Sequence, residues 1–344
     1  MENFLTVASQ VAVLFVLMGA GAAMRRLRLL GDGAVDGMVN MLLFVVTPCV
    51  IVDCFQRPFD SSMLSGLGLA FVIAVAGHLA IIAIARLLVR PRNDDVGRTL
   101  QLAAVFSNAG FMGIPLEQAI LGPKGVFYGV VYVVVFNLFI WTWGVARMEK
   151  GRRKKEKGRS VELATVEEGR RKKEKGRSVE SSGVGLWKMV ANPGTVGIAL
   201  GLPFFLLSAR LPPVMATSVH HVANLNTPMA MIVIGYSLAG AKFGRVAKMA
   251  SVYLASGLRL VVHPLVMVAA LAPFAARLDR DMVLALVVAS SAPVAAMVAM
   301  FASKFRRDVD VGVAVVSATT LASVVTMPPV IAFAMHVLGQ GLAT

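Results

Sequence analysis

The sequence predicts an all-α membrane protein that crosses the bilayer many times, and three observations predict it. Of 344 residues, 57% are apolar. The mean hydropathy is +0.74, which is rare in a soluble globular protein. Many windows of roughly 18 or more mostly apolar residues are long enough to span a bilayer. We therefore expect a polytopic helical protein without a sizeable soluble domain.

The first apolar segment, residues 4–24, is predicted to be a retained transmembrane helix. The start "MENFLTVASQ" has no basic region, and Arg25 and Arg26 follow the apolar run. A cleaved signal peptide has a basic start and a shorter apolar core. Nine further segments follow, so we expect ten transmembrane helices, at residues 4–24, 37–56, 63–89, 98–121, 125–146, 189–209, 214–240, 248–275, 281–302 and 311–338.

The positions of Lys and Arg predict the orientation of these segments. With ten segments, 28 of the 34 basic residues belong to one set of alternate loops and their flanks, 5 belong to the other set, and Arg259 alone is not explained by a loop. Basic residues favour cytoplasmic loops. We expect both termini outside the cytoplasm, the basic loops inside it, and a cell (inner) membrane location.

A strongly basic loop separates two groups of five segments. Residues 147–188 hold 15 Lys or Arg and 7 Asp or Glu, and "GRRKKEKGRSVE" occurs at 151–162 and again at 169–180. The repeated stretch has too few apolar residues to form a core, which predicts disorder. It is either a duplicated tolerant linker or a tether to anionic lipid of the inner leaflet, and nucleic-acid binding is the disfavoured reading. The expected units are residues 1–147, 148–187 and 188–344.

An odd number of segments in each half places the second half upside down, as in inverted-repeat transporters. Two weak internal echoes agree. Thr47-Pro48 in segment two corresponds to Thr227-Pro228 in segment seven, and "FSNAG" in segment four corresponds to "ASSAP" in segment nine. The two echoes have nearly the same offset, so we predict two inverted five-helix repeats.

Segments four and nine carry helix-breaking residues at their centres. "FSNAGFMGIP" contains Asn108, Gly110, Gly113 and Pro115 between residues 106 and 115. Glycine and proline loosen the helical ladder, and freed backbone groups in a membrane must face protein or a water-filled cavity. Interrupted helices at matching positions therefore predict a binding site whose helix N-termini suit an anion. Close helix packing with a harmless kink is the alternative.

Several stretches resemble the auxin efflux carrier family, which includes plant PIN-type carriers and bacterial malate and malonate permease-like carriers. They are "SNAGFMGIPLEQAILGPKG", "VFNLFIWTWG", "NTPMAMIVIGYSLAG", "RLVVHP", "SSAPVAAMVAMFASKF" and "SATTLASVVTMPP". The resemblance covers nearly the whole chain except residues 148–187. It implies broken helices four and nine that cross, a fold like that of bile-acid symporters and sodium–proton antiporters, and an elevator motion. Assembly into a homodimer is a further possibility that these residues leave undecided.

The resemblance also assigns residues to the crossing. Asn108 matches the family's crossover asparagine, Pro293 its crossover proline in helix nine, and Asn137 a polar amide of helix five. Ser107 stands where plant carriers have a proline, so the break would depend on Gly110 and polar contacts. The full expected substrate-binding set is Ser107, Asn108, Gly110, Asn137, Ser290, Ser291 and Pro293, with Gly113 and Pro115 as helix-breaking residues.

Ionisable residues inside the membrane are costly and usually functional. Arg259 is a candidate counter-charge for an anionic substrate or a nearby acid, with packing against carbonyls as the alternative. His78 and His263 are candidates for proton coupling because histidine titrates near neutral pH, although neutral hydrogen-bonded histidines are more common. Asp53 and Glu117, near helix ends, either relay protons or are solvated.

These patterns predict a secondary transporter or facilitator for a small mono- or dicarboxylate, with no cofactor and no metal. The crossover itself lacks Asp and Glu in both halves, which disfavours sodium coupling, but a sodium-coupled symporter of the bile-acid type stays an alternative. A non-transporting sensor or scaffold that acts through the basic loop is the rival of another class. No HExxH set, nucleophile elbow or phosphate loop is present, which disfavours an enzyme.

Overall fold

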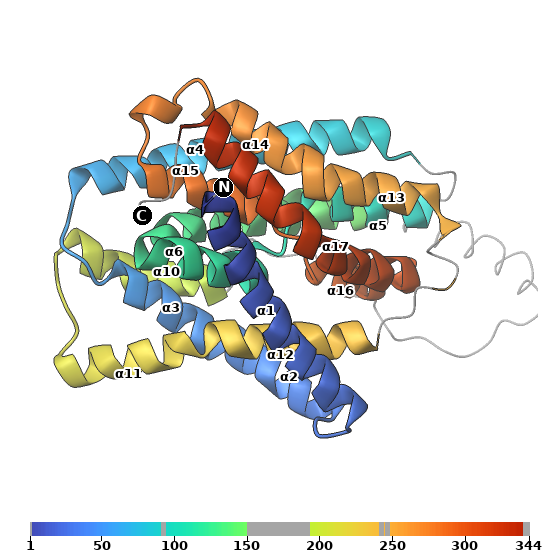
Figure 1. Cartoon of the computed structure of the whole chain (residues 1–344), viewed down its shortest axis with the longest axis horizontal. Helices are drawn as coiled ribbons and strands as arrows, with labels where there is room; N and C mark the ends of the chain where they lie inside the picture. The colour runs from blue at the N-terminus through green and yellow to red at the C-terminus, as the bar shows by residue number, and fades with distance from the viewer. Residues whose placement is uncertain (1, 91–93, 150–192, 241–243, 245–247, 340–344) are drawn as a thin grey trace, which may run out of the picture.

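The computed structural model describes residues 2–90, 94–149, 193–240, 244 and 248–339, and these residues form helices joined by short loops (Figure 1). The helices before the basic loop are α1 (Glu2–Arg26), α2 (Asp32–Met41), α3 (Thr47–Phe55), α4 (Ser61–Leu88), α5 (Asp94–Val105), α6 (Ile114–Phe139) and α7 (Val145–Glu149). Those after it are α10 (Pro193–Leu206), α11 (Pro213–Asn224), α12 (Asn226–Ala239), α13 (Ala250–Gly257), α14 (His263–Leu271), α15 (Arg280–Ser291), α16 (Met297–Lys304) and α17 (Val309–Val337). The predicted all-α class is confirmed. The predictions for the basic loop fall, except at its first two residues, outside the described part of the chain.

Wide π-helical turns precede three prolines. They are η1 (Leu42–Val46) before Pro48, η2 (Ala109–Gly113) before Pro115 and η5 (Leu258–Val262) before Pro264. A proline ring clashes with the carbonyl four residues earlier and offers no N–H. Each of these carbonyls lies inside the wide turn, so the turn gives the ring room and the helix continues. Pro115 therefore loosens its helix but does not end it. A fourth turn, η3 (Ile140–Gly144), has no such proline.

Seven helical stretches in the described residues are long and apolar enough to cross a membrane. The longest, Ala109–Glu149, has 41 residues, and a straight helix of that length would measure about 60 Å, twice the ~30 Å hydrocarbon core. It is not straight. At Gly122, φ is 66° and ψ is −161°, and Pro123 follows. A Cβ added at Gly129 would overlap the Glu117 carboxyl group, whereas residues 12 apart on a straight helix are about 18 Å apart. The chain therefore doubles back here, and α6 consists of two arms.

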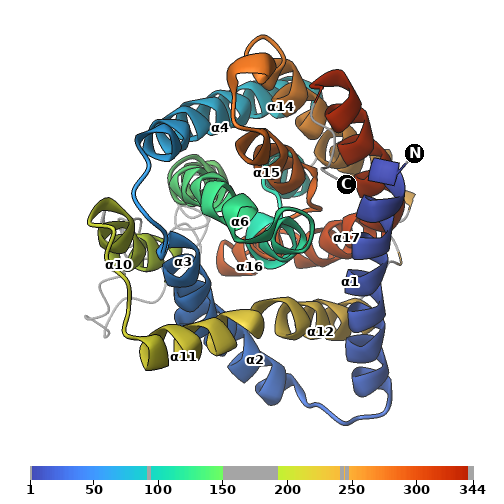
Figure 2. The ribbon, with the colours of Figure 1, turned by 60° about the vertical axis from the view of Figure 1, so that its left-hand side comes forward.

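The two arms of α6 and the neighbouring α15 lie inside a ring of other helices (Figure 2). One wall of the ring is formed by α1 against α12, and by α3 against α10 and α11. Here the backbones approach very closely, since a Cβ at Gly235 would overlap the backbone of Met18 and one at Gly21 the backbone of Ile232. The contact between α1 and α12 is thus packed through glycines, as is common between membrane helices.

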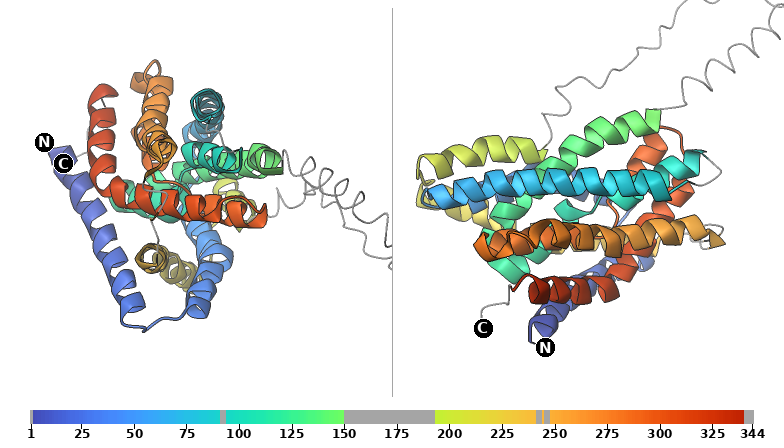
Figure 3. Two further views of the ribbon diagram at one scale, coloured as in Figure 1. Left: turned by 90° about the vertical axis from the view of Figure 1, so that its right-hand side faces the viewer. Right: turned by 90° about the horizontal axis from the view of Figure 1, so that it is seen from above.

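On the other side, α4 lies beside α14 along the length of the molecule (Figures 1 and 3). The Lys124 ammonium group, just after the turn of α6, is 2.7 Å from the Asp279 carboxylate and 3.2 Å from that of Asp281. These ion pairs connect the turn of α6 to the start of α15. Together with the apolar packing of α6 on α15, they make the inner helices one packed unit.

Candidate functional site

The two interrupted segments meet inside the ring. The first is interrupted between Val105, the end of α5, and Ala109, the start of η2, and the second between Ser291, the end of α15, and Met297, the start of α16. Their extended parts form an isolated antiparallel bridge between Ser107 and Val294. We call residues 105–109 and 291–297 the crossing.

Backbone hydrogen bonds join the two chains at the crossing. The N–H of Asn108 donates to the carbonyl of Pro293 at 2.6 Å, and the N–H of Ala295 donates to the carbonyl of Phe106 at 2.9 Å. The N–H of Val294 donates to the hydroxyl of Thr319, on α17, at 3.2 Å. Backbone groups freed by the interruptions are thus satisfied within protein, as the membrane interior requires.

The interruption lies earlier in the chain than the glycine and proline of the motif. Asn108 has φ −79° and ψ 49°, outside the helical range. Gly113 has helical angles, φ −66° and ψ −57°. Gly113 and Pro115 therefore lie in continuous helical backbone, and their predicted role as the break is corrected. Gly113 lies against α15, where a Cβ would be in ordinary contact, 3.5 Å from the Cα of Ala289.

Arg259, from η5, is fully buried beneath the crossing. Its guanidinium group donates to the carbonyl of Val105 at 2.9 Å and also to the carbonyl of Ser290. These carbonyls belong to the last turns of α5 and α15, where a helix dipole is negative. One arginine therefore caps both C-terminal helix ends. It makes no ion pair with an acid among the described residues, and its Nε has no hydrogen-bond partner there.

A chain of side-chain hydrogen bonds leads from Arg259 back to the crossing. The guanidinium group donates to Nδ1 of His263, because a guanidinium group can only donate. A neutral His263 then carries its proton on Nε2, which lies 3.2 Å from the Tyr132 hydroxyl. The Ser107 hydroxyl lies 3.4 Å from the same oxygen. Arg259, His263, Tyr132 and Ser107 thus form one buried polar chain.

His78, on α4, lies at the edge of this chain without a hydrogen bond to it. Its Nδ1 is 2.8 Å from the carbonyl of Ala74, so Nδ1 carries the proton. Its Nε2 is buried and has no partner among the described residues. The ring stacks on Phe139 at 5.4 Å and meets the ring of His263 edge-on at 5.8 Å. The two histidines predicted for proton coupling are therefore neighbours.

The opposite, N-terminal helix ends have no side-chain cap. The Asn108 side chain does not cap η2, and none caps α16. The first N–H groups of a helix have no partner within it, and they carry the positive end of the dipole. Gly110, Ala296 and Met297 are partly exposed, whereas Ser107 and Ser291 are buried. A Cβ at Gly110 would meet nothing within 4 Å, so this side of the crossing has free space.

The side chains of the remaining predicted binding residues already form hydrogen bonds within their own helices. The hydroxyl groups of Ser290 and Ser291 donate to the carbonyl of Val287 at 2.9 and 2.7 Å. The Asn137 amide donates to the carbonyl of Val133 at 2.9 Å. Among the described residues, no hydrogen bond joins its side chain to the crossing. Asn108, by contrast, makes no side-chain hydrogen bond to the described residues and is the amide available to a ligand.

Asp53 and Glu117 lie in different surroundings. The Asp53 carboxylate is 3.0 Å from Nδ1 of the exposed His220, at the outer wall. Glu117, on the first arm of α6, has a side chain with 0% exposure, so the reading of Glu117 as a solvated residue is wrong. Among the described residues, no group of three or more His, Cys, Asp or Glu is placed to hold a metal ion.

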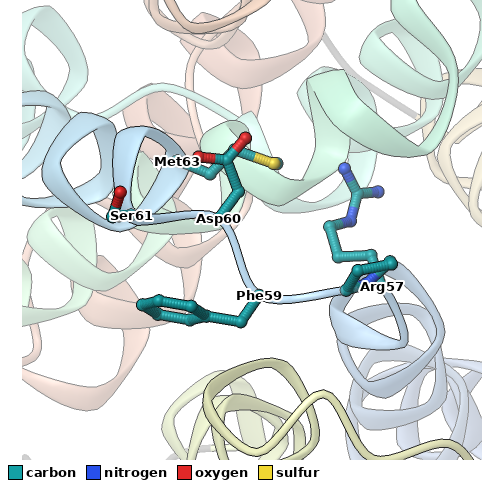
Figure 4. A pocket seen from close by; sticks show the side chains of 6 residues that line it. Arg57, Phe59, Asp60, Ser61 and Met63 are labelled. Carbon is teal, nitrogen blue, oxygen red and sulfur yellow. The ribbon is translucent and has the colours of Figure 1, made fainter.

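An open pocket of about 600 Å³ lies away from the crossing, where α3 joins α4 (Figure 4). Its lining includes Arg57, Phe59, Asp60 and Met63. The hydroxyl and the N–H of Ser62 both donate to the Asp60 carboxylate and hold its pKa below the usual range. Asp60 thereby caps α4. The pocket has few polar groups that converge, and we do not assign it a ligand.

Sequence reasoning missed Tyr132 and Thr319 as members of the site. Tyr132 lies in an apolar run and Thr319 in a segment rich in small residues, and neither has a local pattern that separates it from packing residues. The sequence left packing of Arg259 against a helix end or carbonyls as an alternative, but it did not predict that one arginine caps two helix ends. Such a role depends on the distance between α5, η5 and α15, which only the fold sets.

These features define a class: a multi-pass helical membrane protein with two interrupted segments that meet over a buried cation. The family described as membrane transport protein matches residues 6–331. The chain belongs to this family, which is the auxin efflux carrier family of the sequence resemblance. It is also 26% identical over 266 residues to an uncharacterized transporter of Methanothermobacter thermautotrophicus, covering 76% of this chain and 77% of that protein.

Proposed function

We propose that the chain is a secondary transporter or facilitator that moves a small organic anion, a mono- or dicarboxylate, across the cell membrane. Membership of a membrane transport family supports movement of a solute. The anionic substrate is supported by one observation above all. Arg259 is a fully buried cation with no carboxylate partner among the described residues, at a crossing where two uncapped helix N-termini also meet.

The substrate carboxylate would bind at the N-terminal ends of η2 and α16. First-turn N–H groups and the positive dipole end favour an anion there. The Asn108 amide, free of other hydrogen bonds, would donate to it. Ser290 and Ser291 would contact substrate only after leaving the carbonyl of Val287, and Asn137 only after leaving that of Val133. Arg259 would act from the C-terminal ends of α5 and α15. It would contribute positive electrostatic potential at the crossing without contacting the substrate.

Ten membrane crossings in two inverted halves fit this proposal. The turn in α6 divides it between two crossings, since α5, η2 and the first arm form one interrupted crossing and the second arm belongs to the next, while α15 with α16 forms another interrupted crossing. The two similar Thr-Pro pairs both lie at helix discontinuities. Thr47-Pro48 lies at the junction of η1 and α3, and Thr227-Pro228 lies near the start of α12. The orientation, with both termini outside the cytoplasm, depends on the Lys and Arg distribution alone.

Alternating access would come from movement of one helix group against another. The outer wall consists of six helices, and the remaining helices surround the crossing (Figure 2). The wall helices are α1, α2, α3, α10, α11 and α12. All four helix ends at the crossing belong to the second group. An elevator-like displacement of that group would therefore carry the site as a unit. Every described side chain of the polar chain is buried, which fits a closed state of such a cycle.

A thermal-shift screen of small mono- and dicarboxylates, malate and malonate included, tests the proposal on purified protein. A ligand at a hundred times its Kd stabilises the folded state by about 2.7 kcal/mol. We expect at least one carboxylate to stabilise the wild type, and Asn108→Ala to abolish this shift. Asn40→Ala, at an exposed amide of α2, is the matched control and should keep it. Equal shifts in the wild type and Asn108→Ala, or none in either, would refute the site.

A further inference from the structure

We propose that Glu117 is a proton-binding site that loads and unloads during the transport cycle. The transport part of this inference rests on the proposed function, whereas the binding of a proton does not. Glu117 lies on the first arm of α6, between the crossing and the turn at Gly122. Among the described residues, no hydrogen bond joins it to the polar chain of Arg259, although Tyr132 of that chain is an electrostatic neighbour.

The surroundings of the Glu117 carboxyl group exclude a charged form in this conformation. The side chain is fully buried, and neither carboxyl oxygen has a hydrogen-bond partner among the described residues. An ionised carboxylate without partners is far too costly in an apolar interior, so the group is neutral instead. The neutral form of a carboxyl group carries a proton.

The fold places the carboxyl group against backbone rather than against a counter-charge. A Cβ at Gly129, on the second arm of α6, would overlap the carboxyl group, and one at Gly113 would be 3.8 Å from Oε1. Because Gly129 has no side chain, the carboxyl group occupies the space that a side chain there would fill. The chain thus encloses an acidic group, although burying an acid costs more free energy than burying an apolar residue. Such an arrangement indicates function rather than stability.

The other charged and titratable groups near Glu117 do not neutralise it. Cys54 on α3 and Tyr132 on α6 are the neighbours that interact electrostatically with Glu117. Neither is a cation. The titratable and charged residues on the described parts of the helices that pack against α6, and on α6 itself, are Arg25, Arg26, Cys49, Asp53, Cys54, His78, Arg86, Lys124, Tyr128, Tyr132, Arg280 and Asp281. Lys124 and Asp281 pair with each other, and Asp53 pairs with His220.

Proton binding at Glu117 is coupled to substrate binding through the position of the carboxyl group in the fold. Glu117 lies between Gly113 of η2 and the second arm of α6, and Tyr132, which it influences, contacts Ser107 of the crossing. The closed state needs the neutral form. A state that exposes this region to water tolerates the charged form. The carboxylate therefore takes a proton from the aqueous phase before closure and returns it after the site opens on the other side.

Infrared spectroscopy of the full-length protein in lipid nanodiscs tests proton binding directly. The wild type should show the carbonyl stretch of a protonated carboxylic acid. Glu117→Gln, which keeps the size but not the acid, should lose that band. Glu117→Asp should keep a band at a shifted frequency. This second variant keeps the test decisive if Glu117→Gln does not fold. Asp36→Asn, the control at an exposed carboxylate of α2, should leave the band unchanged. A band that is absent from the wild type, or that survives in Glu117→Gln, overturns the proposal.

Uptake into proteoliposomes tests the coupling, with malonate and malate as probes. An imposed proton gradient should accelerate wild-type uptake, and Glu117→Gln should lose this response while it retains exchange without a gradient. A Glu117→Gln variant that responds like the wild type overturns the coupling. A wild type that transports no carboxylate would refute the proposed function instead, and the infrared result would still decide whether Glu117 holds a proton.

Discussion

At the scale of single residues, Arg259 has the most consequential contacts. A buried arginine in a membrane protein first indicates a partner for an anion. Here the same group donates to carbonyls at the ends of α5 and α15 and to His263. Its charge is therefore partly compensated by two helix dipoles. Arg259 holds the two interrupted segments together and leaves positive potential at the crossing.

This dual role predicts how substitutions at Arg259 behave. Arg259→Met leaves three buried acceptors without a donor, and each unsatisfied group costs about 1–3 kcal/mol. We expect a large loss of thermal stability in detergent, with a smaller loss for Arg259→Lys, which keeps the charge but not the planar fork. Arg86→Met, at an exposed arginine of α4, should change stability by only about 0.5 kcal/mol. If Arg259→Met melts like the wild type, Arg259 does not cap the helix ends.

At the scale of the helices, glycine decides how closely the outer wall packs. Gly235 on α12 faces the backbone of Met18 on α1, with no room for a Cβ. Gly19, one residue further along α1, has nothing within 4 Å. The two positions therefore separate a packing glycine from an ordinary helical glycine on the same pair of helices.

Alanine substitutions at these glycines should have opposite effects. Gly235→Ala forces α1 and α12 apart, and overpacking of this kind costs about 1–3 kcal/mol. Gly19→Ala should be neutral, or stabilising by up to about 1 kcal/mol, because alanine favours helix more than glycine does. Thermal unfolding of both variants in the same detergent checks the pair. Equal melting temperatures for the two variants would contradict close packing at Gly235.

The sequence predicted the helices better than it predicted their interruptions. Long apolar runs and paired breakers were enough to predict an all-α membrane protein and to point to residues 106–115 and the segment around Pro293. The sequence analysis named Gly113 and Pro115 as helix-breaking residues, because glycine and proline are the usual breakers, and expected the break to depend on Gly110 and polar contacts. The chain instead absorbs Pro115 in a π-helical turn and breaks at Ser107 and Asn108, where contacts with Pro293 and Val294 replace helical ones. Such contacts join residues about 185 positions apart, which no local pattern encodes.

At the scale of the whole molecule, the wall and the inner helices form two groups that meet where α1 packs on α17 and α3 packs on α6 (Figure 2). The crossing lies within the inner group. Transport would then depend on the crossing and on movement between groups, and not on the basic loop. A sensor or scaffold that acts through the loop would show the reverse dependence.

Counterflow uptake of labelled malate and malonate into proteoliposomes tests the central claim most directly. It compares the wild type, Asn108→Ala and a chain that lacks residues 151–180, each with sodium and with sodium replaced by choline. The account predicts uptake by the wild type and by the shortened chain in both salts, and loss of uptake in Asn108→Ala. Uptake that survives in Asn108→Ala but disappears with residues 151–180 would contradict a substrate site at the crossing.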